Sequence, residues 1–329
     1  MSVMTHECSE LHIDAALRAA VAIGRARMSQ ERWNQTPIET RLDLIRRMRQ
    51  AIADDAERIA RRITDAHAQR TSAVETLTAE VLPLLDAMRF VERRAVRLLR
   101  TNRLGIAGRP WWMFGMRSRI TREPQGVVLI VAPFNYPLFL PGVAAIQALA
   151  AGNSVVIKPG RSGTTAARIL QRHAAEAGLP DDALIVLDER IESAQAALDA
   201  GPDFVAFTGT ADNRRALSQR AAEQGIPTTM ELSGCDAVFV DRSADVEQVA
   251  AALVFGVTIN SGATCIAPRR VFAHEAIVDQ LIGTLKRRFE RCPALPADPT
   301  AVRTMMRLID AAAADGARVV TGSQTPDGR

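Results

Sequence analysis

Several features that mark other classes of protein are absent from this sequence. No run of about 18 uncharged apolar residues occurs, so no membrane-spanning helix is predicted. The first residues, Met1 to Asp14, include acids and histidines where a secretory signal needs a basic start and an apolar stretch. From these two absences we expect a cytoplasmic protein that has no membrane partner.

Cysteine is also scarce, and its placement excludes two common roles. The four cysteines are far apart, with no CxxC pair and no histidines at metal-ligand spacing: Cys8, Cys235, Cys265 and Cys292. Neither a disulfide framework nor a zinc site is therefore predicted, and we expect no bound metal. The role of a single reactive thiol is not excluded by this placement.

Lysine is nearly missing. Of 41 basic residues only Lys158 and Lys286 are lysines. The arginines are spread along predicted helices instead of forming one patch interleaved with aromatic residues, so the net charge of +4 does not predict nucleic-acid binding. A chain that uses arginine almost everywhere is expected to keep a lysine where a compact ammonium fits and a planar guanidinium does not. This makes Lys158 a residue of interest.

The first third of the chain is predicted to be helical. Residues 1–100 are rich in Ala, Arg, Leu and Glu, and their apolar residues recur at helical spacing. Residues 101–122 break this pattern with glycines, a proline and two adjacent tryptophans. We expect them to form a linker, or a hairpin that packs away from the main body.

From residue 123 to 232 the pattern changes to short apolar strands that alternate with helices. This alternation predicts a mostly parallel sheet covered by helices on both faces, with ligands beyond the carboxyl ends of the strands. A second unit, 233–329, follows. The strands are predicted at 126–132, 154–157, 183–187, 203–207, 237–240 and 317–320, and the helices at 141–151, 163–178, 191–199, 211–224, 245–258, 275–289 and 299–315.

Four short motifs lie where strands are predicted to end. They are Pro-Phe-Asn-Tyr-Pro at 133–137, Val-Val-Ile-Lys-Pro at 155–159, Phe-Thr-Gly-Thr at 207–210 with Glu-Leu-Ser-Gly at 231–234, and Asn-Ser-Gly-Ala-Thr-Cys at 260–265. Each is weak alone, but together, in this order and at these separations, they resemble the aldehyde dehydrogenase superfamily. The resemblance runs from about Ile13 to the last residue. It implies an α/β fold with a Rossmann-type cofactor domain and an incomplete α/β catalytic domain.

Cys265 is the predicted catalytic nucleophile. It follows an Asn-x-Gly-x-x turn and should lie in a loop at the junction of the domains, whereas most free cysteines are small buried hydrophobic residues. A thiolate can attack an aldehyde carbonyl, and the resulting thiohemiacetal can collapse with loss of hydride. The resemblance implies this role for Cys265, and the other cysteines lack such a setting.

The resemblance implies two further catalytic residues. The amide of Asn135 and the backbone N–H of Cys265 would donate to the developing oxyanion. Glu231 would be the general base that activates water against the thioacyl-enzyme, and its presence favours a carboxylic acid product over acyl transfer to coenzyme A. Otherwise Asn135 is an ordinary turn residue and Glu231 an acid at a strand end.

A nicotinamide dinucleotide is the implied cofactor. Lys158 resembles the family's lysine on the adenosine ribose, and Pro133 and Phe134 belong to the same implied site. Arg161 stands where relatives that prefer NAD often carry an acid. A guanidinium there would accept a 2′-phosphate, so we expect NADP slightly ahead of NAD. The alternative is that Arg161 faces solvent.

The pyrophosphate of that cofactor is expected near Gly209 and Thr210. These residues end a predicted strand and open a helix, where free N–H groups and the helix dipole attract anions. Many family members carry a second glycine five residues after the first, but this chain has Arg214. This part of the cofactor site therefore departs from the family pattern.

Together these features predict NAD(P)-dependent oxidation of a small-molecule aldehyde to a carboxylic acid. A homo-oligomer stays open: residues 101–122 resemble one half of the family's pairing surface, but the C-terminal strand that pairs with it in relatives is missing. The family's downstream Glu-x-Phe-Gly-Pro-type motif and C-terminal strands do not occur before Arg329, so we expect a C-terminally short member or a fragment. Two other functions stay open. One is a non-catalytic nucleotide-binding or subunit-pairing remnant, and the other is a cofactor-independent thiol esterase that uses Cys265 and Glu231.

Overall fold

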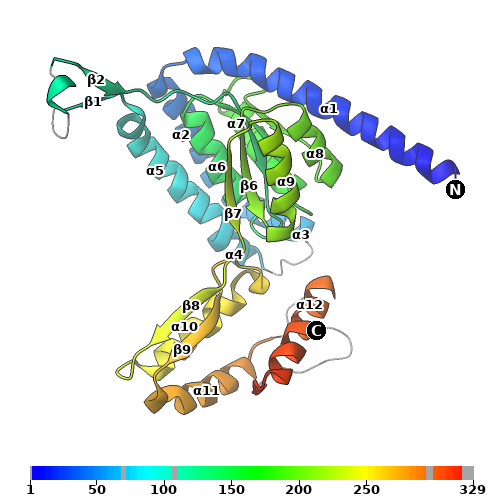
Figure 1. The fold of residues 1–329 in the computed structure, drawn as a ribbon, viewed down its shortest axis with the longest axis vertical. Helices are drawn as coiled ribbons and strands as arrows, with labels where there is room; N and C mark the ends of the chain where they lie inside the picture. Colours follow the sequence, from blue (N-terminus) through cyan, green and yellow to red (C-terminus); the bar gives the residue numbers. More distant parts are fainter. Residues whose placement is uncertain (1, 68–71, 106–109, 114, 294–298, 321–329) are drawn as a thin grey trace. The chain divides into compact units, whose positions relative to one another are not determined.

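The computed structural model of the chain describes residues 2–67, 72–105, 110–113, 115–293 and 299–320 (Figure 1). The backbone divides into two units. The first comprises Met1–His67 and Thr76–Glu231, and the second comprises Ala68–Glu75 and Leu232–Arg329.

A five-stranded sheet forms the centre of the first unit, in the order β5-β4-β3-β6-β7. β3 pairs in parallel with both β4 and β6, and β4 pairs in parallel with β5. Every residue of β3 and β4 is buried, which explains their unbroken Val and Ile runs. The bounds are β3 (Val127–Val131), β4 (Ser154–Lys158), β5 (Leu184–Val186), β6 (Phe204–Gly209) and β7 (Thr228–Leu232).

Helices cover both faces of this sheet, so the predicted parallel α/β arrangement is confirmed (Figure 1). Two helices that follow β3 and β4 pack on one face, α6 (Phe139–Ala150) and α7 (Thr164–Glu176). The long α1 (Ser2–Gln35) and α8 (Ile191–Asp199) contact the sheet from the other side, and α9 (Ala211–Glu223) contacts α8 and β6.

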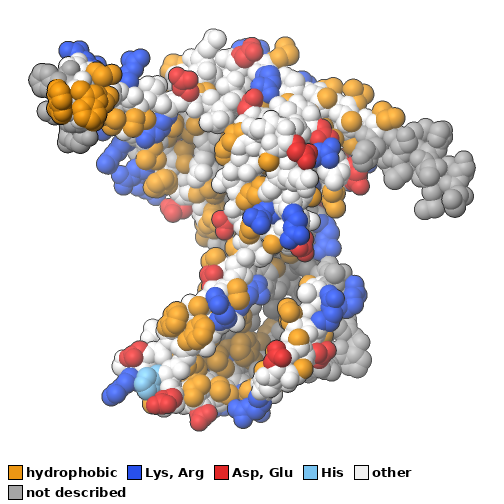
Figure 2. Space-filling view, viewed as in Figure 1, with side chains coloured by type: hydrophobic (Ala, Val, Ile, Leu, Met, Phe, Trp, Pro, Cys, Tyr) orange, Lys and Arg blue, Asp and Glu red, His pale blue; other side chains and the backbone are white. Residues whose placement is uncertain are grey.

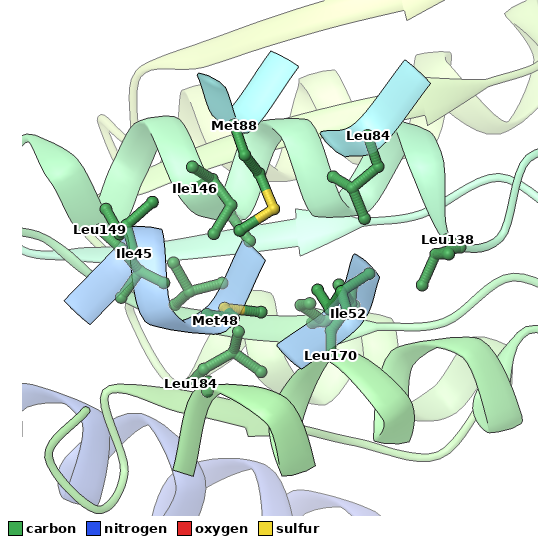
Figure 3. Close-up of a cluster of buried hydrophobic side chains, with 14 of the residues drawn as sticks. Ile45, Met48, Ile52, Leu84, Met88, Leu138, Ile146, Leu149, Leu170 and Leu184 are labelled. Atoms are coloured by element: carbon green, nitrogen blue, oxygen red, sulfur yellow. The ribbon is translucent and has the colours of Figure 1, made fainter. Parts of the chain in front are cut away.

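A further helical layer lies over α6 and α7, as the apolar periodicity of residues 1–100 predicts. It consists of α2 (Ile38–Asp54), α3 (Ala56–Ala66), the π-helix η1 (Leu77–Val81) and α5 (Leu82–Leu99). Its buried side chains meet those of α6 in the main hydrophobic core, which includes Ile45, Met48, Ile52, Leu84, Met88, Ile146 and Leu149 (Figure 3). This core fixes the helices that carry the loops at the sheet edge.

The segment after α5 forms a hairpin, one of the two predicted alternatives. β1 (Asn102–Leu104) and β2 (Ser118–Ile120) pair antiparallel, and a short 3₁₀ turn, η2 (Trp111–Met113), lies between them. Trp111 is 84% exposed and Trp112 is 69% exposed, and apolar side chains gather at this tip (Figure 2). The hairpin therefore presents an uncovered apolar surface.

The second unit contains a smaller α/β arrangement. β8 (Asp236–Val240) and β9 (Pro268–Ala273) pair in parallel and are connected through α10 (Val246–Thr258) and the 3₁₀ turn η3 (Ile259–Gly262). Its buried core is small, with Val240, Val246, Ala250, Leu253 and Leu281. The remaining elements are α4 (Ala73–Thr76), which ends at the boundary between the units, α11 (Glu275–Phe289) and α12 (Pro299–Ala314).

The predicted strand at 317–320 is wrong. These residues form no strand in the described part of the chain, and Val319 is 58% exposed. A short apolar run becomes a strand only when another strand accepts its backbone hydrogen bonds, and none lies beside it among the described residues.

Candidate active and cofactor site

The carboxyl ends of β3 and β6 are the candidate ligand-binding edge of the first unit. The two strands are neighbours and parallel, yet β3 leads into α6 on one face and β6 leads into α9 near the other. Such a change of direction leaves a crevice between the two loops, and ligands bind there in open parallel sheets. Four of the predicted site residues lie in these loops: Pro133, Phe134, Asn135 and Thr210.

The β3–α6 loop (residues 132–138) presents the predicted oxyanion donor. Pro133 and Pro137 are buried, Asn135 is half-buried and Phe134 is 37% exposed. The two prolines fix the backbone on either side of the asparagine because their φ angles are restricted. The side chain of Asn135 is thus carried by a rigid turn at the sheet edge.

Two buried ionisable side chains hold this loop from outside it. A carboxylate oxygen of Glu80 accepts hydrogen bonds from the backbone N–H groups of Leu138 (3.1 Å) and Phe139 (2.7 Å), where α6 begins. The Nε2 atom of His67 lies 2.8 Å from the carbonyl oxygen of Phe134. Glu80 is fully buried and His67 is 4% exposed. The sequence interpretation missed both residues, although an acid and a histidine inside apolar helical patterns were a usable signal.

The loop after β4 packs directly on the β3–α6 loop. A Cβ atom at Gly160 would overlap the Pro133 carbonyl oxygen and lie 2.6 Å from the Phe134 nitrogen, so only glycine permits this approach. The exposed Arg161 guanidinium lies 5.9 Å from the centre of the Phe134 ring, within cation–π distance. The structure therefore brings Pro133, Phe134 and Arg161 together.

Lys158, the last residue of β4, is a buried cation, with 8% of its surface exposed. Burial lowers the pKa of its ammonium, while the negative charges of Glu189 and Asp188 oppose that shift. Both acids follow β5, the neighbouring strand. They were not predicted, although their position after a strand of the same parallel sheet was readable from the sequence.

Asp188 is kept ionised by its own partners. Burial alone would raise the pKa of its carboxyl, but hydrogen bonds from Arg190 and Ser193 outweigh burial and lower the pKa to about 2. Glu189 accepts a hydrogen bond from the hydroxyl of Thr164 at 3.1 Å. The surroundings of Lys158 are therefore acidic near neutral pH.

The β6–α9 junction is the expected pyrophosphate position. Thr210 is the N-cap of α9, and its hydroxyl accepts an N–H of the first turn. Gly209 packs on the ring of Phe207, since a Cβ atom there would lie 2.6 Å from the ring. The first turn carries Asp212, and Arg214 follows it, both exposed. An acid in this turn weakens the attraction for phosphate, and an arginine beside it restores some of that attraction.

Glu231 lies in β7, one residue before the strand ends. Its side chain is exposed and lies at the end of the strand where the polypeptide leaves the first unit. The predicted strand-end position is thus observed.

Cys265 belongs to the second unit, in the loop between α10 and β9 (residues 259–267, the cysteine loop). Three consecutive residues before it have left-handed backbone angles: φ is 56° at Asn260, 52° at Ser261 and 76° at Gly262. Such conformations cost free energy at a residue other than glycine, least at asparagine. Strain of this kind concentrates at functional sites.

Short-range hydrogen bonds maintain the cysteine loop. The side-chain amide of Asn260 donates to the Ala263 carbonyl at 3.3 Å, and the Thr264 hydroxyl donates to the Ile259 carbonyl at 3.3 Å. The backbone N–H of Asn260 donates to the Glu75 carboxylate at 2.5 Å. The loop is thus shaped largely by its own residues.

The backbone of Cys265 is closely packed. A Cβ atom at Gly234 would lie 2.7 Å from the Cys265 carbonyl oxygen, so the chain after β7 packs against the backbone of this residue. Cys265 is half-buried, Cys235 is exposed, and the thiol of Cys292, just after α11, donates to the Arg288 carbonyl.

Two other features are absent from the described residues. No cluster of three or more His, Cys, Asp or Glu side chains that could hold a metal ion occurs among them. Nor does any helix in the described ranges combine the length and apolar character needed to cross a membrane.

The sheet, its helices and its edge crevice define the first unit as a Rossmann-type α/β fold. A second α/β unit carries a cysteine in a strained loop. The chain belongs to the aldehyde dehydrogenase family, which matches it over residues 5–329.

Individual relatives agree with this membership. The chain is 29% identical over 280 residues to a 4,4'-diapolycopene aldehyde oxidase of Methylomonas sp, which covers 84% of this chain and 52% of that protein. It is 38% identical over 204 residues to the NADP/NAD-dependent aldehyde dehydrogenase PuuC of Escherichia coli (strain K12), covering 60% of this chain and 41% of that one. The matches thus span about half of these relatives' length.

Solved structures share the fold. An aldehyde dehydrogenase from Brucella melitensis biovar abortus 2308 superposes with a TM-score of 0.83 at 22% identity, over 93% of this chain and 64% of that chain. An indole-3-acetaldehyde dehydrogenase complexed with NAD⁺ gives a TM-score of 0.84 at 24% identity, over 95% and 65%. The predicted aldehyde-dehydrogenase-like fold is therefore confirmed.

Proposed function

We propose that this chain provides the nucleophile, the oxyanion donor, the general base and part of the cofactor site of an enzyme that oxidises an aldehyde to a carboxylic acid with NAD or NADP. The observation that carries the proposal is the cysteine loop: in a member of this family, strained left-handed residues shape the backbone just before Cys265. The first unit is the proposed cofactor domain with the hairpin 101–122 as its pairing segment. The second unit is the proposed catalytic domain.

In the proposed reaction the Cys265 thiolate attacks the carbonyl carbon of the aldehyde and forms a C–S bond. The carbonyl π electrons move to oxygen, where the Asn135 amide and the Cys265 backbone N–H stabilise the negative charge. The oxyanion then re-forms the carbonyl, and the C–H electron pair leaves as hydride, which gives a thioester. Glu231 takes a proton from the water that cleaves this thioester.

The residues of the first unit fit a dinucleotide in part. The nicotinamide ring, when bound, supplies the hydride acceptor. Lys158 offers a buried ammonium at the carboxyl end of β4, suited to ribose hydroxyls. Thr210 and the start of α9 offer backbone N–H groups to the pyrophosphate, although Asp212 in that turn opposes it.

We propose a modest preference for NADP. The Arg161 guanidinium is exposed beside Phe134, where a 2′-phosphate could pair with it. Glu189 works against this preference, because its negative charge, which raises the pKa of Lys158, would repel a 2′-phosphate. The variant Arg161→Glu should lower kcat/KM for NADP about tenfold or more while affecting NAD little, because one charge-assisted contact is lost and a repulsion is added. A better kcat/KM with NAD than with NADP in the unaltered chain would contradict the preference.

The function is tested with purified protein, NAD or NADP, and a panel of aldehydes. We expect formation of reduced nucleotide that falls by about 10³-fold or more in Cys265→Ala, since the nucleophile is removed. The matched control is Cys235→Ala, which removes the exposed cysteine and should leave the rate unchanged.

The other two functions predict different results in the same experiment. Nucleotide binding with no reduction of NAD or NADP by any aldehyde would indicate a non-catalytic remnant. Hydrolysis of an ester substrate such as 4-nitrophenyl acetate, dependent on Cys265 and indifferent to nucleotide, with no aldehyde oxidation, would indicate a thiol esterase.

A further inference from the structure

A second cavity of the first unit lies away from the proposed site. Its volume is about 280 Å³, and its wall includes Glu123 and Pro124, just before β3, and Ala151, just before β4. β3 and β4 are parallel, so this is the amino edge of the sheet. Asn135 and Lys158 follow or end the same strands at the carboxyl edge, and the cavity is therefore a separate site.

Arg41 lines this cavity and is a buried cation. It is 9% exposed, and among the residues that the structure describes neither its Nε nor its Nη1 atom has a hydrogen-bond partner. Burial lowers the pKa of its guanidinium, and only the more distant charge of Glu39 opposes that shift. Arg49 on the same helix shows the usual arrangement: although it is less buried than Arg41, its guanidinium holds Glu92 at 2.6 Å.

The backbone beside Arg41 is shaped to admit the guanidinium. Gly152 has φ of +92°, and a Cβ atom there would overlap Arg41 Nη1. The Gly152 carbonyl already accepts a hydrogen bond from Gln30 at 3.1 Å. A guanidinium stays charged at any physiological pH, and leaving two buried N–H groups unpaired is costly. A ligand that pairs with them would remove that cost.

The rest of the wall indicates what such a ligand is. Arg100 and Arg122 also line the cavity, and Glu123 is the one acidic residue among its lining residues, so the charged wall is net positive. Ile38, Val96 and Leu99 supply an apolar side. A planar oxyanion pairs with guanidinium groups through two hydrogen bonds, and a short hydrocarbon suits the apolar side.

We propose that this cavity binds a small organic oxyanion, a carboxylate or phosphate group on a short aliphatic body, through Arg41 with support from Arg122. The site is independent of the proposed dehydrogenase reaction.

The test measures binding of hexanoate and of hexyl phosphate to the full chain by titration calorimetry at constant ionic strength. Hexan-1-ol is the neutral control, and inorganic phosphate is the anion without an aliphatic body. We expect saturable binding of at least one of the two organic anions, weaker binding of inorganic phosphate and none of hexan-1-ol. Arg41→Gln should weaken the organic anion about tenfold or more, since a charge-assisted bidentate contact is lost.

Control variants separate binding from folding. Arg47→Gln, on the same helix, changes a 62% exposed side chain that pairs with Asp43 and should bind like the unaltered chain. Arg122→Gln changes an exposed residue, so it should fold normally and still weaken binding several-fold. Cys265→Ala should bind the organic anions like the unaltered chain, which distinguishes binding in this cavity from binding of an acid in the proposed active site.

The proposal is overturned if hexan-1-ol binds as well as hexanoate, or if Arg41→Gln and Arg122→Gln both bind like the unaltered chain. It is also overturned if neither organic anion binds. In that last case Arg41→Gln should lower Tm equally with and without hexanoate, which would show that the guanidinium only stabilises the fold near the end of α6.

Discussion

The β3–α6 loop and the cysteine loop carry the two proposed groups that meet the aldehyde carbonyl, and they are built differently. The β3–α6 loop is held from outside by Glu80, in η1 of the helical layer, and by His67, which follows α3, and both are buried. The cysteine loop is held by its three left-handed residues, by the side chain of Asn260 and by Glu75, all in the second unit. Its unit has a small core, with Phe239 79% and Phe272 51% exposed and stacked 5.1 Å apart.

The two loops should therefore respond differently to substitution. A substitution that loosens the β3–α6 loop should destabilise the whole first unit, because the residues that anchor the loop lie within its packed interior. Damage to the cysteine loop should stay within the second unit, because the residues that hold the loop, Glu75 and Gly234 included, all belong to that unit. All three tryptophans lie in the first unit, so tryptophan fluorescence reports on that unit alone.

The largest expected effect is that of Glu80→Leu. The backbone N–H groups of Leu138 and Phe139 would lose a charged acceptor inside the protein, which should cost about 3 kcal/mol of unfolding free energy. Glu80→Gln keeps an acceptor oxygen and should cost about 1 kcal/mol. Urea unfolding followed by tryptophan fluorescence measures both. Equal losses in the two variants would show that the charge, not the acceptor, holds the loop.

Gly160→Ala should be next. The new Cβ atom would lie 2.6 Å from the Phe134 nitrogen, and backbone atoms cannot move aside as a flexible side chain can. Overpacking of this kind costs about 2 kcal/mol in the same unfolding experiment. The control is Gly24→Ala in α1, where nothing lies within 4 Å and a gain of about 0.5 to 1 kcal/mol is expected. A neutral Gly160→Ala would mean that the two loops move independently.

Asn260→Ala tests whether a change in the cysteine loop stays within the second unit. Alanine tolerates φ of 56° poorly and lacks the amide that donates to Ala263, so a local cost of about 1 to 2 kcal/mol is expected. Alkylation of Cys265 by iodoacetamide, followed by peptide mass spectrometry, should accelerate several-fold. Asn260→Gly, which accepts the angle but lacks the side chain, should accelerate it less. A clear change in the tryptophan unfolding curve of Asn260→Ala would contradict the local character of this loop.

The smallest effect concerns Asp188 and depends on pH. Its folded pKa of about 2 lies below the ordinary 3.8, so its contribution to stability is present above about pH 4 and is lost as the pH falls toward 2. The unaltered chain should therefore be slightly more stable than Asp188→Asn at neutral pH, and the difference should shrink on acidification. Urea unfolding at several pH values measures it. A difference that does not vary with pH would contradict the ionic origin.

Sequence patterns predicted much of the first unit. The Val and Ile runs of β3 and β4, together with the helical spacing between them, gave the parallel sheet, and the predicted strands end within two residues of those observed. The apolar run at 317–320 failed because strand formation depends on a partner strand, which a local pattern does not contain. The choice between a linker and a hairpin at 101–122 was likewise left open by the sequence, and the pairing of β1 with β2 decides it.

For the candidate site, residues that act within a motif were predicted and residues that act across elements were missed. Asn135, Lys158 and Cys265 were found because each follows or ends a recognisable run. Glu80 and His67 were missed because they reach the β3–α6 loop from positions 58 and 67 residues away in the chain. Hydrogen bonds over such separations exist only once the helices have packed.

By itself, the sequence determined the order of strands and helices, the motif residues and the resemblance they carry, because these depend on local periodicity and spacing. Tertiary structure decided how those residues are held. It placed the acids after β5 beside Lys158, set the backbone of Gly160 against Pro133, and buried Arg41 at the opposite edge of the sheet. Charge, strain and burial at a site depend on which surfaces meet, and that is a property of the packed chain.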